Sequence, residues 1–211
     1  MQATVPAVIV RHRGTRTAID SLRVVAAAAA HVCNWAAAAE GRQRTERVLR
    51  ALDPSAWRVL NHVGVPGGGH VDHVVVGSAG TYVIHSEAWR GVVTVDQKGA
   101  TITPAHDPDA AWTARGRHRS LAPTAAAVVH GLAAATGSWM PAPRAVVVVW
   151  APFPDAVVVS GGVTYVAGLE LADWLGAQPR RPDHDHLDAL RTGVLTSDTS
   201  GLRRIRGRQP V

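Results

Sequence analysis

Residues 66–95 read PGGGHVDHVVVGSAGTYVIHSEAWRGVVTV. Two runs rich in β-branched residues, 70–76 and 81–87, lie on either side of the sequence GSAG at 77–80. β-Branched residues favour strands, and a short segment with glycine at both ends favours a tight turn. The stretch therefore predicts a β-hairpin, and the following GVVTV at 91–95 predicts a third strand.

The predicted hairpin brings four polar groups to one end of one sheet face. Centring the turn within 77–80 places Asp72 opposite His85 and His70 opposite Glu87. Because side chains alternate between the two faces of a strand, all four share a face. A slip of one residue would scatter them. Imidazoles and carboxylates bind metals or carry protons, although a polar rim at the edge of the core gives the same pattern.

The rest of the chain predicts helices and strands that surround this hairpin. The apolar run at 145–150 predicts a strand that is buried on both faces and covered by helices. The alanine-rich segment 18–52 favours a helix in one or two pieces, with Gly41 as the expected break. The other expected elements are strands at 57–63, 100–103, 157–159 and 163–166, helices at 121–136, 168–175 and 183–192, and a polar loop at 106–118.

This order predicts an α/β fold with a mixed central sheet, in which an antiparallel three-strand meander is flanked by helices. We expect one domain over 18–195, with a flexible basic arm at 1–17 and a flexible basic tail at 196–211.

Composition excludes several classes of protein. The single cysteine, Cys33, excludes an internal disulfide and a cysteine-built zinc site, which agrees with a cytoplasmic location. The apolar run 24–39 is short for a membrane span and contains His31 and Asn34, so we expect no membrane segment. A net charge of +6 with clustered arginines suits phosphate contacts, although arginine-rich solvated segments have the same composition.

Residues 36–175 resemble the NERD domain, a nuclease-related domain of bacterial proteins in the PD-(D/E)XK nuclease-like superfamily. The resemblance rests on the glycine-rich segment before the hairpin, on Asp72-His73 in a valine-rich strand, on the position of the turn, and on Trp89 and Gly91. It implies a restriction-endonuclease-like core and cleavage of nucleic acid with a divalent metal.

The resemblance also implies roles for motif positions, several of which hold other residues in this chain. The superfamily holds its metal with an Asp on the second strand and an acidic residue on the third, and a lysine two residues later assists the attacking water. Asp72 matches the first ligand, whereas His85 occupies the second acidic position and Glu87 the lysine position. The first helix of the family carries Gly-Glu, and Gly41-Arg42 stands here. Leu121 and Thr124 replace the Pro-x-x-Gln of the second helix.

Three hypotheses follow. The leading one is a catalytically impaired nuclease-fold protein that binds nucleic acid, with DNA as the expected partner, through Arg42, Arg44, Arg115, Arg117 and Arg119. The second is an active metal-dependent DNA phosphodiesterase, in which Mg²⁺, Mn²⁺ or Zn²⁺ is held by Asp72, His85, Glu87 and, as an optional fourth ligand, His70. The third is a protein-interaction module in which the polar group is merely hydrogen-bonded.

Overall fold

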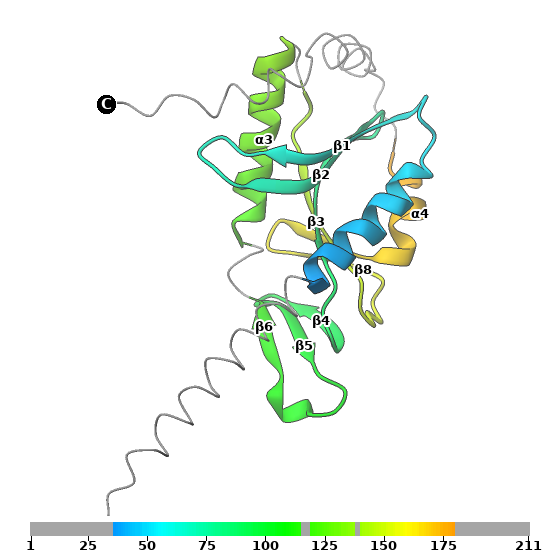
Figure 1. Ribbon diagram of the computed structural model, residues 1–211, viewed down its shortest axis with the longest axis vertical. Helices are drawn as coiled ribbons and strands as arrows, with labels where there is room; N and C mark the ends of the chain where they lie inside the picture. Colours follow the sequence, from blue (N-terminus) through cyan, green and yellow to red (C-terminus); the bar gives the residue numbers. More distant parts are fainter. Residues whose placement is uncertain (1–35, 115–118, 138–139, 180–211) are drawn as a thin grey trace, which may run out of the picture. The chain divides into compact units, whose positions relative to one another are not determined.

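The structure is a computed structural model that describes residues 36–114, 119–137 and 140–179 (Figure 1). Its elements are a helix over 36–50, β1 (Trp57–Gly64), β2 (His70–Gly77), β3 (Gly80–Glu87), β4 (Val92–Asp96), β5 (Gly99–Thr103), η1 (Pro108–Ala110), β6 (Trp112–Ala114), α3 (Leu121–Thr136), β7 (Arg144–Val149), β8 (Val157–Ser160), β9 (Val163–Ala167), η2 (Gly168–Glu170) and α4 (Leu171–Gly176). The expected arm at 1–17, the expected helix at 183–192 and the expected tail at 196–211 lie outside the described residues.

Strands β1, β2 and β3 form an antiparallel meander, as the fold class predicts, whereas the strand expected at 91–95 after the hairpin pairs with β5 in a second sheet. The β2–β3 ladder runs from the pair His73↔Ile84 to the pair Gly77↔Gly80, which is the register that the turn predicts. Strand β1 pairs with the other edge of β2 and is an edge strand of the sheet. The turn signal in the sequence therefore set both the pairing and the face of each side chain.

The meander is part of a six-stranded mixed sheet with the order β1-β2-β3-β7-β9-β8. Strand β7 lies at its centre, parallel to both β3 and β9, and is covered on both faces as its unbroken apolar sequence predicts. On one face, Val146 packs with Leu49 of the 36–50 helix and Leu171 of α4. On the other face, Val147 packs with Val128 of α3. Figure 1 shows these helices on opposite sides of the strands.

A second, three-stranded antiparallel sheet of order β4-β5-β6 lies between β3 and α3 in the chain. Its buried residues Val93 and Ile102 join the same core as α3. Gly91 starts it at φ +147°, where an added Cβ would lie 2.5 Å from the Thr103 carbonyl oxygen, so only glycine fits there. The predicted polar loop at 106–118 is wrong in part, because Trp112–Ala114 pairs with β5 as β6. This strand is only three residues long and carries no alternating pattern of its own.

The expected helix break at Gly41 is also wrong, because the helix runs through this residue without interruption. An added Cβ at Gly41 would lie 3.3 Å from the backbone nitrogen of Ala88 and 3.5 Å from the carbonyl carbon of Glu87. Gly41 thus lets the helix backbone approach the end of β3 closely. None of the helices in the described part of the chain is long and apolar enough to cross a membrane.

Candidate functional site

The polar group predicted from the hairpin lies where β2 and β3 stop pairing. The ladder ends at His73↔Ile84, so the Ser86 amide, two residues further along β3, needs another acceptor on the β2 side. The Asp72 carboxylate supplies it, because Oδ2 accepts a hydrogen bond from the Ser86 amide at 2.8 Å. The Asp72 side chain is 3% exposed. A buried carboxylate thus continues the strand pairing that the backbone no longer makes.

His85 bridges two carboxylates. Its Nδ1 lies 3.0 Å from Asp72 Oδ2, and its Nε2 lies 3.3 Å from Glu87 Oε1. Burial disfavours a charged imidazole, but the hydrogen bonds and the negative charges of Asp72 and Glu87 outweigh it and raise the pKa of His85 to about 9. At neutral pH, His85 is therefore an imidazolium with both ring N–H groups donated to carboxylates.

Asp72 is held in its charged form. Burial alone would favour the protonated acid, yet the hydrogen bonds from His85 and from the Ser86 amide, together with the charges of His85 and Arg42, lower the pKa of Asp72. Arg42 reaches the group from the 36–50 helix, with Nη1 at 4.0 Å from Asp72 Oδ1. The helix position where the family carries a glutamate thus contributes a cation here.

A second hydrogen-bond network lies behind this group and was missed by the sequence analysis. Thr45 is fully buried, and its Oγ1 accepts hydrogen bonds from Ser86 Oγ and Trp150 Nε1, both at 2.8 Å. The same hydroxyl donates to the Gly41 carbonyl oxygen at 3.1 Å. Thr45 therefore joins the helix, β3 and the residue after β7. No local sequence signal marks it, because its partners lie 41 and 105 residues away.

Two histidines of the hairpin have other surroundings. His70 is exposed, and its ring lies 4.2 Å from the ring of His62, centroid to centroid. His73 is buried, and its Nδ1 is 2.8 Å from Asn61 Oδ1 on β1. Burial lowers the pKa of His73. The structure therefore brings together Asp72, His85 and Glu87, and it places His70 against β1 rather than in this group.

The arginines proposed to contact nucleic acid have different surroundings. Arg44 is exposed, pairs with Glu40 on the same helix and lies over the Trp150 ring at 5.8 Å. Arg42 faces Asp72, as described above. Arg119 is exposed just before α3. Arg115 and Arg117 lie outside the described residues.

The residues present do not suit a divalent metal. Both ring nitrogens of His85 already face carboxylates, so neither has a lone pair directed at a metal. The two acids, Asp72 and Glu87, are matched by two cations, His85 and Arg42. Within residues 36–114, 119–137 and 140–179, no group of three or more His, Cys, Asp or Glu side chains is arranged to hold a metal ion. The charge that a metal would supply is already present in the side chains.

The mixed sheet, its antiparallel meander and the helices on both faces are consistent with a nuclease-like α/β core, with the polar group at the open end of β2 and β3. Residues 37–121 match the family model of NERD, the nuclease-related domain, as the resemblance predicts. This match covers the first helix, the β1–β3 meander and the β4–β6 sheet, and the PD-(D/E)XK nuclease-like superfamily is consistent with that family. Searches of curated proteins and of solved structures gave no match.

Proposed function

We propose that this protein is a catalytically impaired member of the nuclease-fold proteins, which binds nucleic acid without cleaving it. The observation that carries the proposal is the His85 bridge between Asp72 and Glu87. An imidazolium in that position neutralises the carboxylates that would otherwise attract a cation.

The charges of the four motif positions support this proposal. The family pattern has an acid on the first helix, an acid on each of two strands and one lysine, which leaves an excess of negative charge for a divalent metal. Here the corresponding residues are Arg42, Asp72, His85 and Glu87. Their formal charges cancel, so a hard cation such as Mg²⁺ would face no net attraction and would have to displace a bound proton.

The proton chemistry of the group points the same way. A nuclease needs a base or a metal-bound hydroxide to activate water. An imidazolium with a pKa of about 9 has no free lone pair at neutral pH, so His85 cannot accept the proton. The lysine of the family pattern has no equivalent, because Lys98, the one lysine of the sequence, lies in the turn between β4 and β5.

Binding of nucleic acid is supported by charge. The chain carries 22 basic and 16 acidic residues, and Lys98 is the only basic residue that is not arginine. Guanidinium groups suit phosphate oxygens because they donate two parallel hydrogen bonds. We expect Arg44 and Arg119 to contribute among the described residues, since both are exposed. Arg42 contributes less, because it faces Asp72.

A cleavage assay tests the impaired site. The purified protein is incubated with plasmid and with single- and double-stranded oligonucleotides in Mg²⁺, Mn²⁺ or Zn²⁺. The expected result is no cleavage above that of Asp72→Ala. Cleavage that Asp72→Ala abolishes would overturn the proposal and favour the rearranged nuclease, with Asp72, His85 and Glu87 as ligands.

A motif-restoring variant sharpens the same test. Arg42→Glu, His85→Glu and Glu87→Lys together restore the acids and the lysine of the family pattern. We expect this variant, once circular dichroism shows it folded, to bind Mg²⁺ in calorimetry when the natural sequence does not. Equal Mg²⁺ affinity in both proteins would contradict the charge argument.

A salt series tests nucleic-acid binding. Phosphate contacts release counterions, so affinity should fall steeply as salt rises, and the loss of one contact should reduce the slope of log K against log salt by about 1. Arg119→Gln should have this effect, with Arg47→Gln as the control of equal charge on an exposed helix position. A protein that binds neither DNA nor RNA at low salt would instead favour the protein-interaction module.

A further inference from the structure

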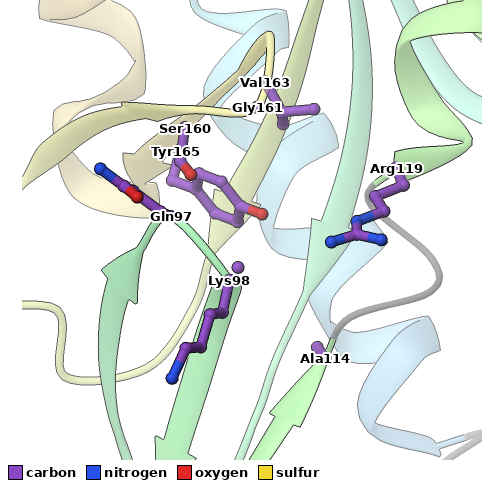
Figure 2. A pocket seen from close by; sticks show the side chains of 9 residues that line it. Gln97, Lys98, Ala114, Arg119, Ser160, Gly161, Val163 and Tyr165 are labelled. Carbon is purple, nitrogen blue, oxygen red and sulfur yellow. The ribbon is translucent and has the colours of Figure 1, made fainter.

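A basic pocket is lined by residues other than those that form the group around His85. It is lined by Gln97, Lys98, Arg119, Ser160, Gly161 and Tyr165, among others (Figure 2). These residues come from the β4–β5 turn, the β8–β9 turn, strand β9 and the start of α3. We call it the Lys98 pocket.

Hydrogen bonds hold the two turns of the Lys98 pocket in place. The Ser160 hydroxyl on the β8–β9 side donates to the Asp96 carbonyl oxygen at 2.6 Å. Within the β4–β5 turn, the Lys98 amide donates to Asp96 Oδ1 at 2.7 Å. The backbone around Lys98 is thus fixed by two bonds to one residue, and the wall of the pocket is formed without a ligand.

The lining of the Lys98 pocket carries a net positive charge. Two cations, Lys98 and Arg119, line it, and the nearby Asp96 carboxylate accepts a hydrogen bond from the Lys98 amide within the β4–β5 turn. Burial raises the pKa of Tyr165 to about 12, so its hydroxyl adds no negative charge at neutral pH. Figure 2 shows the Arg119 guanidinium directed toward the space beside Tyr165, whereas the Lys98 side chain runs away from that space. The long, flexible stem of a lysine allows its ammonium to close on a bound anion.

We propose that the Lys98 pocket binds a phosphate group. Arg119 would donate two hydrogen bonds to phosphate oxygens, and Lys98 would add a point charge from the opposite turn. The Gln97 amide would supply a neutral donor. Removing either cation would leave a single charge on an open surface, which binds phosphate only weakly.

The phosphate can come from a nucleic-acid backbone or from a small phosphorylated molecule. The first source deepens the proposed function and rests on it, since Arg119 belongs to both sites. The second source is independent of it. Binding of inorganic phosphate therefore tests the pocket even if the protein has no affinity for nucleic acid.

Lys98 offers a direct probe because it is the only lysine in the sequence. Reductive methylation with ¹³C-formaldehyde labels its side chain and keeps the positive charge, and the α-amino group gives a separate signal that serves as an internal reference. The Lys98 signal is then followed by NMR during titration with inorganic phosphate, with a short oligonucleotide and, as a control anion, with acetate at matched ionic strength.

The expected result is a saturable shift of the Lys98 signal with phosphate and little shift with acetate. Arg119→Gln should weaken the phosphate affinity at least fivefold, and Arg47→Gln should leave it within twofold. A stronger effect of the oligonucleotide assigns the phosphate to nucleic acid, and an effect of phosphate alone assigns it to a small molecule.

The proposal is overturned if neither phosphate nor oligonucleotide shifts the Lys98 signal, or if Arg119→Gln binds phosphate as the unaltered protein does. The salt series on the unlabelled protein separates the two failures. If the protein binds DNA in that series but the Lys98 signal does not shift, the phosphate site is refuted and the proposed function stands.

Discussion

The two ends of the β2–β3 hairpin are held by different kinds of interaction. Toward the turn, backbone hydrogen bonds join His73↔Ile84 through Gly77↔Gly80, and the side chains between them are buried. At the open end the ladder stops, and the contacts pass to side chains. The Asp72 carboxylate accepts a hydrogen bond from the Ser86 amide, and His85 bridges the carboxylates of Asp72 and Glu87.

This difference separates local from long-range information. The turn end depends on residues within the hairpin, so its geometry follows from a short stretch of sequence. The open end depends on Arg42 and Thr45 of the 36–50 helix and on Trp150 after β7. The candidate functional site therefore lies where the hairpin depends on contacts with segments that are distant in the sequence.

The largest expected effect is in the paired part of the hairpin, at the pair that ends its ladder. Ile84→Ala removes a fully buried side chain from the core between β3 and the 36–50 helix, and it should lower the free energy of unfolding by about 3 kcal/mol. Urea denaturation followed by circular dichroism measures it. Val159→Ala, on the exposed edge strand β8, is the control and should cost less than about 0.5 kcal/mol. Equal losses would mean that the apolar core does not stabilise the paired part of the hairpin.

The second effect is confined to the open end and depends on pH. The pKa of His85 is raised in the folded state to about 9 from an ordinary value of 6.5, so folding binds its proton more tightly. This stabilisation is fully present below pH 6.5 and is lost as pH rises through about 9, a change of about 3 kcal/mol.

Unfolding measured in urea from pH 6 to 9.5 shows this loss. His85→Gln should flatten the dependence, whereas His130→Gln, at an exposed position of α3, should retain it. The lowered pKa of Asp72 affects stability at acidic pH, because the stabilisation by its charged form is lost as pH falls through the folded-state pKa. An unchanged pH profile in His85→Gln would refute the imidazolium bridge.

A third effect tests the network behind the open end. Thr45→Val keeps the shape of the side chain but removes the acceptor of Ser86 Oγ and Trp150 Nε1, and it should cost about 1–2 kcal/mol. Thr94→Val, at an exposed position of β4, is the matched control and should be nearly neutral. Trp150 fluorescence should also change in Thr45→Val. A neutral Thr45→Val would mean that water replaces the lost acceptor.

Much of the fold could be predicted from the sequence, because its decisive signals are short-range. The hairpin register followed from the turn at 77–80, and the burial of β7 followed from its unbroken apolar run. The same register brought Asp72 and His85 together. A strand pair converts sequence distance into spatial contact by a fixed rule, and no tertiary information is needed.

The parts that could not be predicted depend on packing between distant segments. Strand β6 has three residues, and its partner β5 fixes it. His70 pairs with Gly64 of β1, and its ring lies against that of His62, where β1 departs from regular strand geometry at a φ of +57°. A turn-based register gives no information about either contact.

Gly41 provides the smallest and most discriminating test, because its sequence context suggests a break and the structure shows a close contact. In an exposed helix, replacing glycine by alanine gains up to about 1 kcal/mol. Gly131→Ala in α3 should show this gain, since its Cβ would meet only Pro66 Cγ, at 3.4 Å. Gly41→Ala should gain less or lose stability, since its Cβ would lie 3.3 Å from the Ala88 nitrogen. It should also shift the NMR signals of the Glu87 and Ala88 amides. Because Glu87 contacts His85, the distance between these two side chains should change as well. Equal gains in the two variants would show that the helix has room at Gly41 and that the open end is less tightly coupled to it than the backbone distances imply.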